Sequence, residues 1–175
     1  VKRKIQEIHW TPDMVEKQGY QHFMLKEIHE QPQAIIQTLQ DRVTKDRDDV
    51  ILNDFSLTPE DIKRIRKVFL VACGTAYHAA MVGKYLIELM ARIPCEVDIA
   101  SEFRYRDPII GGDDLLIAIS QSGETADTLA ALREAKKRGA RTLSICNVKG
   151  SSIDRESEST LYTYAGPEIG VASTK

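Results

Sequence analysis

Two short, unbroken apolar runs constrain the fold of this chain more than any other feature. Residues 68–72 read Val-Phe-Leu-Val-Ala and are stopped by Gly74, and residues 115–119 read Leu-Leu-Ile-Ala-Ile. Apolar runs this short suit strands that are buried on both faces, as in a parallel sheet. The two runs therefore predict interior strands of such a sheet.

Helical patterns alternate with strand-like patterns around these runs. One helix is predicted over residues 75–92, with apolar side chains along one side, and another over residues 124–138. The apolar side consists of Ala79, Val82, Leu86, Leu89 and Met90. Further strands are predicted at residues 95–99, 142–146 and 160–165, the last preceded by a short helix. The predicted fold class is α/β, a three-layer α/β/α sandwich around a doubly wound, five-stranded parallel sheet.

The character of the strands predicts their order. The first and third are purely apolar and belong in the centre, whereas the second and fifth mix polar and apolar residues and belong at the edges. The flavodoxin-like order 2-1-3-4-5 fits, and its switch point lies between strands 1 and 3. We therefore expect a ligand beyond the carboxyl ends of these strands, at the loops after Ala72 and Ile119.

The chain divides into two predicted parts. Residues 1–57 are predicted as an N-terminal linker and helical extension, with a charged helical pattern over 14–43, a break before Pro32, and a polar connection over 44–57. Residues 58–175 are predicted as the sheet domain, which opens with the Thr-Pro-Glu-Asp start of another helix.

Composition excludes several classes of partner. Basic and acidic side chains number 24 and 26, so the net charge of -2 predicts neither a nucleic-acid nor a membrane partner. No apolar run approaches the roughly 20 residues of a transmembrane helix. Cys73, Cys95 and Cys146 have no paired spacing and fall in predicted strands, which favours buried free thiols and a cytoplasmic location. Because the chain begins at Val1 without Met, we expect an excised or processed piece.

The two loops at the switch point carry the equipment for holding a phosphate. Residues 73–75 read Cys-Gly-Thr, and residues 120–125 read Ser-Gln-Ser-Gly-Glu-Thr. The second loop supplies three hydroxyls, an amide, and Gly123, which lets backbone N–H groups approach a ligand closely. A helix N-terminus adds N–H groups and the positive end of the helix dipole. The same residues could be ordinary helix caps, but two such loops at one switch point favour phosphate binding.

Other kinds of site are weakly supported. Neither loop has the G-x-G-x-x-G spacing, and no G-x-x-x-x-G-K-[ST] motif occurs, so no cofactor is predicted. Cys73 is a weak candidate nucleophile because His78 lies one turn into the next helix and no acid partner is indicated. His22 and His29 are seven residues apart, too far to share a metal easily, and no metal site is predicted.

Residues 120–128, Ser-Gln-Ser-Gly-Glu-Thr-Ala-Asp-Thr, resemble the phosphosugar signature of sugar isomerase (SIS) domains, in the form carried by the glucosamine-6-phosphate synthase family. The resemblance runs through nearly the whole chain, in the family's order. Its other blocks are residues 22–28, 30–32, 72–75, 93–97, 100–106, 145–148, 150–152 and 168–175.

The resemblance implies one subdomain of a glutamine-dependent enzyme that makes glucosamine 6-phosphate from fructose 6-phosphate. It implies phosphate contacts at Ser120, Gln121, Ser122 and Thr125, and sugar contacts at Cys73, Gly74, Thr75, Val171 and Ser173. The bound phosphosugar would be fructose 6-phosphate, glucosamine 6-phosphate or glucose 6-phosphate. One departure is Ala76, where the family often has Ser.

The same resemblance implies what this chain does not contain. The family's glutaminase domain, its second SIS subdomain and its catalytic lysine, glutamate and histidine lie outside this sequence, so no catalytic residue is predicted here and the isolated chain is expected to bind without turnover. The family implies a homodimer, and hence an exposed apolar face. The alternatives are a phosphosugar-sensing SIS module of a regulatory protein, against which residues 1–60 show no basic recognition helix, and a free-standing phosphosugar isomerase.

Overall fold

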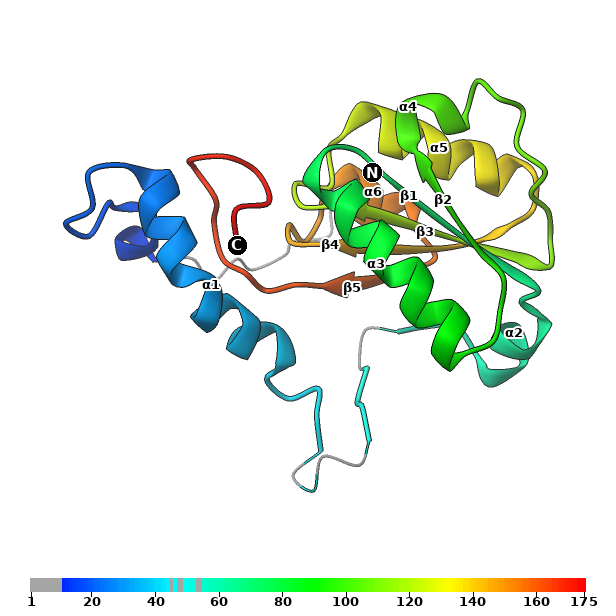
Figure 1. Cartoon of the computed structure of the whole chain (residues 1–175), viewed down its shortest axis with the longest axis horizontal. Helices are drawn as coiled ribbons and strands as arrows, with labels where there is room; N and C mark the ends of the chain where they lie inside the picture. The colour runs from blue at the N-terminus through cyan, green and yellow to red at the C-terminus, as the bar shows by residue number, and fades with distance from the viewer. Residues whose placement is uncertain (1–10, 45, 47–48, 53–54) are drawn as a thin grey trace, which may run out of the picture.

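The computed structural model describes residues 11–44, 46, 49–52 and 55–175, and a five-stranded parallel sheet forms its centre. The strands are β1 (Lys67–Ala72), β2 (Cys95–Ile99), β3 (Asp114–Ser120), β4 (Arg141–Cys146) and β5 (Ser159–Tyr162). Their order is β2-β1-β3-β4-β5, and every pairing is parallel (Figure 1). The predicted strand order is confirmed.

Helices cover both faces of the sheet. The helical elements are η1 (Pro12–Val15), α1 (Phe23–Leu39), α2 (Pro59–Arg64), α3 (Thr75–Met90), α4 (Ala100–Phe103), α5 (Ala126–Lys137) and α6 (Ser152–Glu156). Helix α3 lies on one face, whereas α4, α5 and α6 lie on the other (Figure 1). The three-layer α/β/α sandwich is confirmed. Helix α4 was not predicted, because a single turn is too short to carry a periodic pattern.

Alternation along the strands explains why the two apolar runs are unbroken. Phe69 and Val71 of β1 pack with α5 and α6 in one core, whereas Val68 and Leu70 pack with α3 in a second core. Successive side chains of a strand point to opposite faces, so both sets need apolar residues when both faces are covered.

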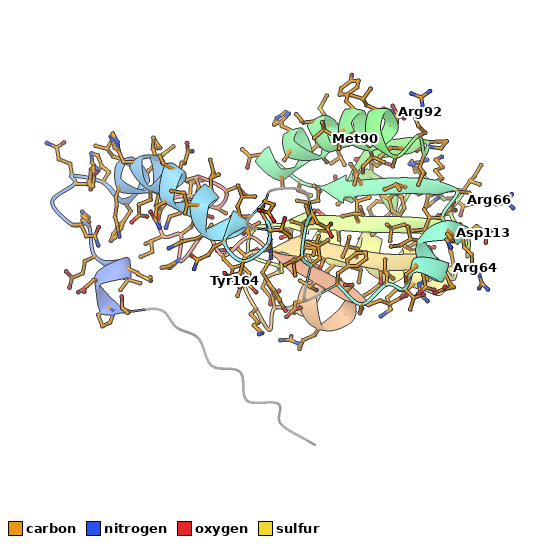
Figure 2. The ribbon with its side chains drawn as sticks, turned by 90° about the horizontal axis from the view of Figure 1, so that it is seen from below. Arg64, Arg66, Met90, Arg92, Asp113 and Tyr164 are labelled. Atoms are coloured by element: carbon orange, nitrogen blue, oxygen red, sulfur yellow. The ribbon has the colours of Figure 1, made fainter. Side chains whose placement is uncertain are left out.

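The apolar side of α3 turns away from the sheet. Val82, Leu89 and Met90 expose 60%, 69% and 79% of their surfaces, and Figure 2 shows α3 with Met90 along one face of the sheet. The helix meets the sheet through small residues instead. Ala80 is fully buried, and a Cβ on Gly83 would lie 3.3 Å from Leu70 Cδ1. Small residues let α3 approach closely, which leaves its larger apolar side chains uncovered.

The predicted bounds of the N-terminal helix were wrong at both ends, and so was its break. Gln18 and Gly19 have φ of 49° and 86°, a conformation that no helix continues through, so α1 begins only at Phe23. The helix ends at Leu39 and runs through Pro32. Pro32 lacks the N–H that would bond to Ile28, but both residues are exposed, so water can satisfy the carbonyl of Ile28.

The predicted start of α2 is confirmed. Thr58 and Asp61 form a reciprocal capping box, in which the Asp61 N–H donates to Thr58 Oγ1 and the Thr58 N–H donates to Asp61 Oδ2. The start of the predicted extension and part of the 44–57 connection lie outside the described residues.

All three cysteines are free, but their predicted strand positions are only partly right. Cys95 and Cys146 lie in strands and are buried, whereas Cys73 follows the end of β1 and is half-buried. In the part of the chain that the structure describes, no helix is long and apolar enough to span a lipid bilayer.

Candidate functional site

The loop at residues 120–125, here called the cradle, joins β3 directly to α5. Ser120 is buried, and its Oγ accepts the Gly123 N–H at 3.1 Å and lies 3.0 Å from Thr125 Oγ1. Ser122 Oγ accepts the Glu124 N–H at 3.2 Å. These contacts stay within the loop, so the cradle holds its own shape around three hydroxyls.

Gly123 fixes how the cradle sits on the rest of the domain. Its φ is +67°, and a Cβ at this position would lie 2.0 Å from Ser151 Oγ and 2.5 Å from Ser151 Cβ. Its carbonyl accepts the Ile153 N–H at 2.9 Å. The backbone of the cradle therefore packs directly on the start of α6, and only glycine fits there.

The N-terminus of α5 separates the two interpretations of the cradle hydroxyls. Thr125 occupies the N-cap position, but its side chain makes no capping hydrogen bond to α5. Ser122 bonds to Glu124, which precedes the helix. The hydroxyls are therefore not helix caps, and the first-turn N–H groups of α5 carry the positive end of the helix dipole toward the loop.

The second predicted loop, residues 73–75, lies beside the cradle. Ala72 pairs with Ile119, so β1 and β3 end next to each other. Thr128 of α5, which is fully buried, donates its hydroxyl to Cys73 Sγ at 4.0 Å. Gly74 has φ 59° and opens α3, and both Gly74 and Thr75 are exposed. The structure thus brings together the two loops that the strand order singled out.

Asn147 is a site residue that the sequence reasoning missed. Its N–H donates to the Gln121 carbonyl at 3.0 Å, its Nδ2 donates to the Gly166 carbonyl at 2.6 Å, and its Oδ1 accepts the Ala165 N–H at 2.8 Å. A polar residue directly after a third buried strand, β4, was the available signal. Asn147 connects the cradle to the chain that follows β5.

Val171 and Ser173 lie further from the cradle than the other predicted residues. Both belong to residues 166–175, here called the C-terminal segment. Val171 is 55% exposed and its carbonyl accepts the Thr174 hydroxyl, whereas the Ser173 N–H donates to Glu168 Oε2 at 2.8 Å. Among the described residues these bonds stay inside the segment, and the path to the cradle runs through Asn147.

The electrostatics of the site are nearly neutral. Burial raises the pKa of the Cys146 thiol to about 11, and Cys146 lies beneath Gly123, with its Cβ 3.8 Å from a Cβ built there. Hydrogen bonds from Ser152 lower the pKa of Glu124, on the outer edge of the cradle. The described residues contain no cluster of three or more His, Cys, Asp or Glu that could hold a metal ion. An anion here would be bound by hydroxyls and backbone N–H groups.

Comparison with known proteins agrees with this geometry. The chain is 61% identical over 175 residues to the glutamine–fructose-6-phosphate aminotransferase (isomerizing) of Clostridium tetani, covering all of this chain and 29% of that protein. It is 53% identical over 173 residues to the enzyme of the same name from Methanosarcina acetivorans, covering 99% of this chain and 28% of that protein. The chain therefore spans less than a third of the length of these curated relatives.

Solved structures give the same picture. The C-terminal domain of glucosamine-fructose-6-phosphate aminotransferase from Francisella tularensis matches with a TM-score of 0.83 and 47% identity, over 91% of this chain and 45% of that chain. The sugar isomerase domain of an RpiR transcription factor from Sphaerobacter thermophilus shares the fold, with a TM-score of 0.58 and 21% identity over 79% of this chain and 73% of that chain. The SIS domain family matches residues 61–175, most of the chain, and this protein therefore belongs to the SIS domain family.

Proposed function

We propose that this chain is the fructose-6-phosphate- and glucosamine-6-phosphate-binding half of the isomerase domain of a glutamine-dependent glucosamine-6-phosphate synthase, a glutamine–fructose-6-phosphate aminotransferase (isomerizing). The observation that carries the proposal is the cradle, whose hydroxyls lie at the N-terminus of α5 without capping it. The high identity over the whole chain to aminotransferases of this name supports it.

Phosphate binding in the cradle needs no cationic side chain. The hydroxyls of Ser120, Ser122 and Thr125 and the first-turn N–H groups of α5 can donate to phosphate oxygens. Hydrogen bonds to a charged acceptor contribute about 1.5–3 kcal/mol each. Four or five such bonds suffice for micromolar-to-millimolar binding, at about −8 to −4 kcal/mol, after ordering costs.

The sugar would extend from the cradle toward two further groups of residues. Gly74 and Thr75 are exposed beside the cradle, and Val171 and Ser173 lie on the C-terminal segment that Asn147 joins to it. In this role the chain binds and orients the phosphosugar. The groups that perform the chemistry would come from the rest of the longer protein, so we expect binding without turnover.

The regulatory alternative is less well supported. The match to a transcription-factor sugar isomerase domain is only 21% identical and shows the fold alone. The identity of 61% to an aminotransferase extends over all 175 residues and includes α1, which lies before the part matched by the SIS domain family.

We further propose that the longer protein is a cytoplasmic homodimer. The outward face of α3 supports this proposal, because Val82, Tyr85, Leu86, Leu89 and Met90 are all more than half exposed. An apolar face of this kind marks a contact surface. Three free cysteines fit a reducing compartment.

The test is a calorimetric or NMR titration of the chain with fructose 6-phosphate, glucose 6-phosphate, free fructose and inorganic phosphate. Both phosphosugars should bind saturably and free fructose should not. Ser122→Ala should weaken phosphosugar binding about tenfold, the value of one hydrogen bond to a charged group. Ser157→Ala, which removes one hydroxyl bond to the Ile153 carbonyl on α6, is the matched control and should leave binding unchanged. A folded chain that binds fructose as well as its phosphate would contradict the proposal.

A further inference from the structure

Helix α1 lies along the chain that follows β5, although the two are far apart in sequence. Figure 1 shows the C-terminal segment running back beside α1, at the edge of the sheet toward which β5 points. Near the end of the helix, Thr38 donates its hydroxyl to the Thr163 carbonyl and Arg42 donates to the Tyr162 carbonyl at 2.5 Å. Gln31 Nε2 donates to the Thr174 carbonyl, also at 2.5 Å. The helix therefore supports the backbone of this chain over much of its length.

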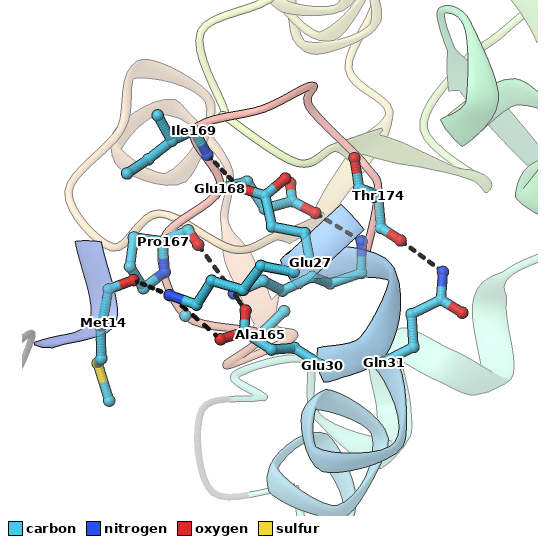
Figure 3. Close-up of polar contacts among 12 residues, drawn as sticks. Met14, Glu27, Glu30, Gln31, Ala165, Pro167, Glu168, Ile169 and Thr174 are labelled. Atoms are coloured by element: carbon cyan, nitrogen blue, oxygen red, sulfur yellow. Dashed lines mark hydrogen bonds and ion pairs between the residues drawn. The ribbon is translucent and has the colours of Figure 1, made fainter. Parts of the chain in front are cut away.

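Glu27 makes the central contact between α1 and the C-terminal segment. Its Oε1 accepts the Ile169 N–H at 2.6 Å and the Gly170 N–H at 3.0 Å (Figure 3). Glu27 is only 2% exposed, and its Oε2 has no hydrogen-bond partner among the described residues. A carboxylate is costly to bury, so one held by two adjacent N–H groups serves to fix the backbone that it binds.

Gly170 shows that the contact is close on both sides. A Cβ at Gly170 would lie 2.7 Å from Met24 N, 2.9 Å from Met24 Cα and 3.0 Å from Glu27 Oε2. Two of these atoms belong to the backbone of α1, which cannot move aside cheaply. The C-terminal segment thus touches the helix backbone itself, and only glycine allows it.

Further charged contacts close the C-terminal segment on itself and on α1. Lys175 is 5% exposed at its side chain, and its Nζ lies 2.9 Å from the Pro167 carbonyl and 2.7 Å from Glu30 Oε2. Glu168 accepts the N–H groups of Ser173 and Lys175 at 2.8 Å and 2.7 Å. Lys26 lies 3.3 Å from the other oxygen of Glu30. Residues 167–175 are therefore a closed loop with a single seat on the helix.

We propose that Glu27, together with Gly170, is a positioning residue for the sugar end of the ligand, an inference that rests on the proposed function. The phosphate end would bind to the cradle, whose contacts are its own. The sugar end would meet Val171 and Ser173, which directly follow the backbone that Glu27 holds. Helix α1 is then part of the ligand site and not only a spacer before it. Loosening the contact should displace Val171 and Ser173 and leave the cradle intact.

The test compares two ligands on the full 175-residue chain. Dissociation constants for fructose 6-phosphate and for inorganic phosphate are measured for the wild type, Glu27→Ala and Gly170→Ala. Both variants should bind fructose 6-phosphate about tenfold more weakly, the loss of roughly one hydrogen bond to the ligand. Both should keep their affinity for inorganic phosphate within about twofold, because its binding uses only the cradle. Gln33→Ala, on the exposed side of α1, is the matched control and should change neither constant.

The possible failures are distinguishable. If both ligands weaken equally, Glu27 supports the fold in general and the inference is wrong, and the same holds if neither weakens. If the folded wild type binds neither ligand, the proposed function itself is wrong. Amide exchange gives a check that needs no ligand: the Ile169 and Gly170 N–H groups should be protected in the wild type and exchange freely in Glu27→Ala. Free exchange in the wild type would also overturn the inference.

Discussion

The cradle and the C-terminal segment are two regions of one candidate site, and they are built in different ways. The hydrogen bonds inside the cradle join residues at most five positions apart, and the loop rests on the sheet core through Ser151 and Ile153. The bonds from Glu27 to the C-terminal segment join residues 142 and 143 positions apart. A ligand site can thus combine one part whose shape is local with another whose shape depends on distant contacts.

The two regions also differ in charge. The cradle is held by hydroxyls and backbone groups, whereas the C-terminal segment is held by carboxylates and ammonium groups, several of them buried. Buried charges stabilise little on balance, because desolvation offsets their attraction, but removing one partner is costly. We therefore expect the cradle to share the stability of the sheet, and the C-terminal segment to open locally.

The largest effect is expected at Gly123. Gly123→Ala should lower the free energy of unfolding by about 3 kcal/mol, because the new Cβ would overlap Ser151 and φ of +67° is strained for alanine. Gly139→Ala is the matched control, with φ of +84° and open space around the Cβ, and should cost about 1 kcal/mol. Urea denaturation measures both, and equal losses would mean that the cradle is not seated on α6 as described.

Gly170→Ala should separate local from global stability. The clash with the Met24 backbone should release the C-terminal segment, so the amides of Ile169 and Gly170 should exchange about tenfold or more faster in hydrogen-exchange measurements. The amides of β3 should be unaffected. Gly111→Ala, where no atom lies within 4 Å of the new Cβ, is the control. A uniform rise in exchange across the sheet would mean that the two regions unfold as one.

Alkaline pH should act on the cradle side of the comparison. Burial raises the pKa of Cys146 to about 11 from an ordinary value of 9.0, so the folded state prefers the protonated thiol. Its stabilising contribution is complete below about pH 9 and should be lost as the pH rises to about 11, by up to about 2 kcal/mol. Cys146→Ala should flatten this part of the pH profile of the unfolding free energy. An unchanged slope would contradict the assignment, whatever the variant's stability at neutral pH.

The smallest effect is expected at Glu124, on the exposed rim of the cradle. Hydrogen bonds from Ser152 lower its pKa, so its contribution is present above the ordinary Glu pKa and is lost as the pH falls through the lowered value. Glu124→Gln should therefore narrow slightly the difference between the unfolding midpoints measured at pH 7 and pH 3. Glu60→Gln, at the exposed start of α2, is the comparison variant. A large effect at Glu124 would mean that the rim carries more of the cradle's stability than its exposure allows.

Much of the fold and half of the site could be predicted from local patterns. Both faces of the sheet are covered, so β1 and β3 need apolar residues at every position, and the pattern is visible in the sequence. The edge strands mix polar residues for the same reason in reverse. Strand order then brings the Cys-Gly-Thr loop and the cradle to one switch point, because parallel strands end at the same edge.

The sequence by itself thus determined the α/β architecture, the strand order and the cradle, since each depends on residues that are neighbours in the chain or in a regular pattern. Only the tertiary structure decided that α1 supports the C-terminal segment, that Asn147 joins this segment to the cradle, and that the apolar side of α3 faces outward. The physical reason is that these features arise from packing between distant residues. Glu27 bears no local mark of the two N–H groups that it binds, and the stripe on α3 looks the same whether or not the sheet covers it.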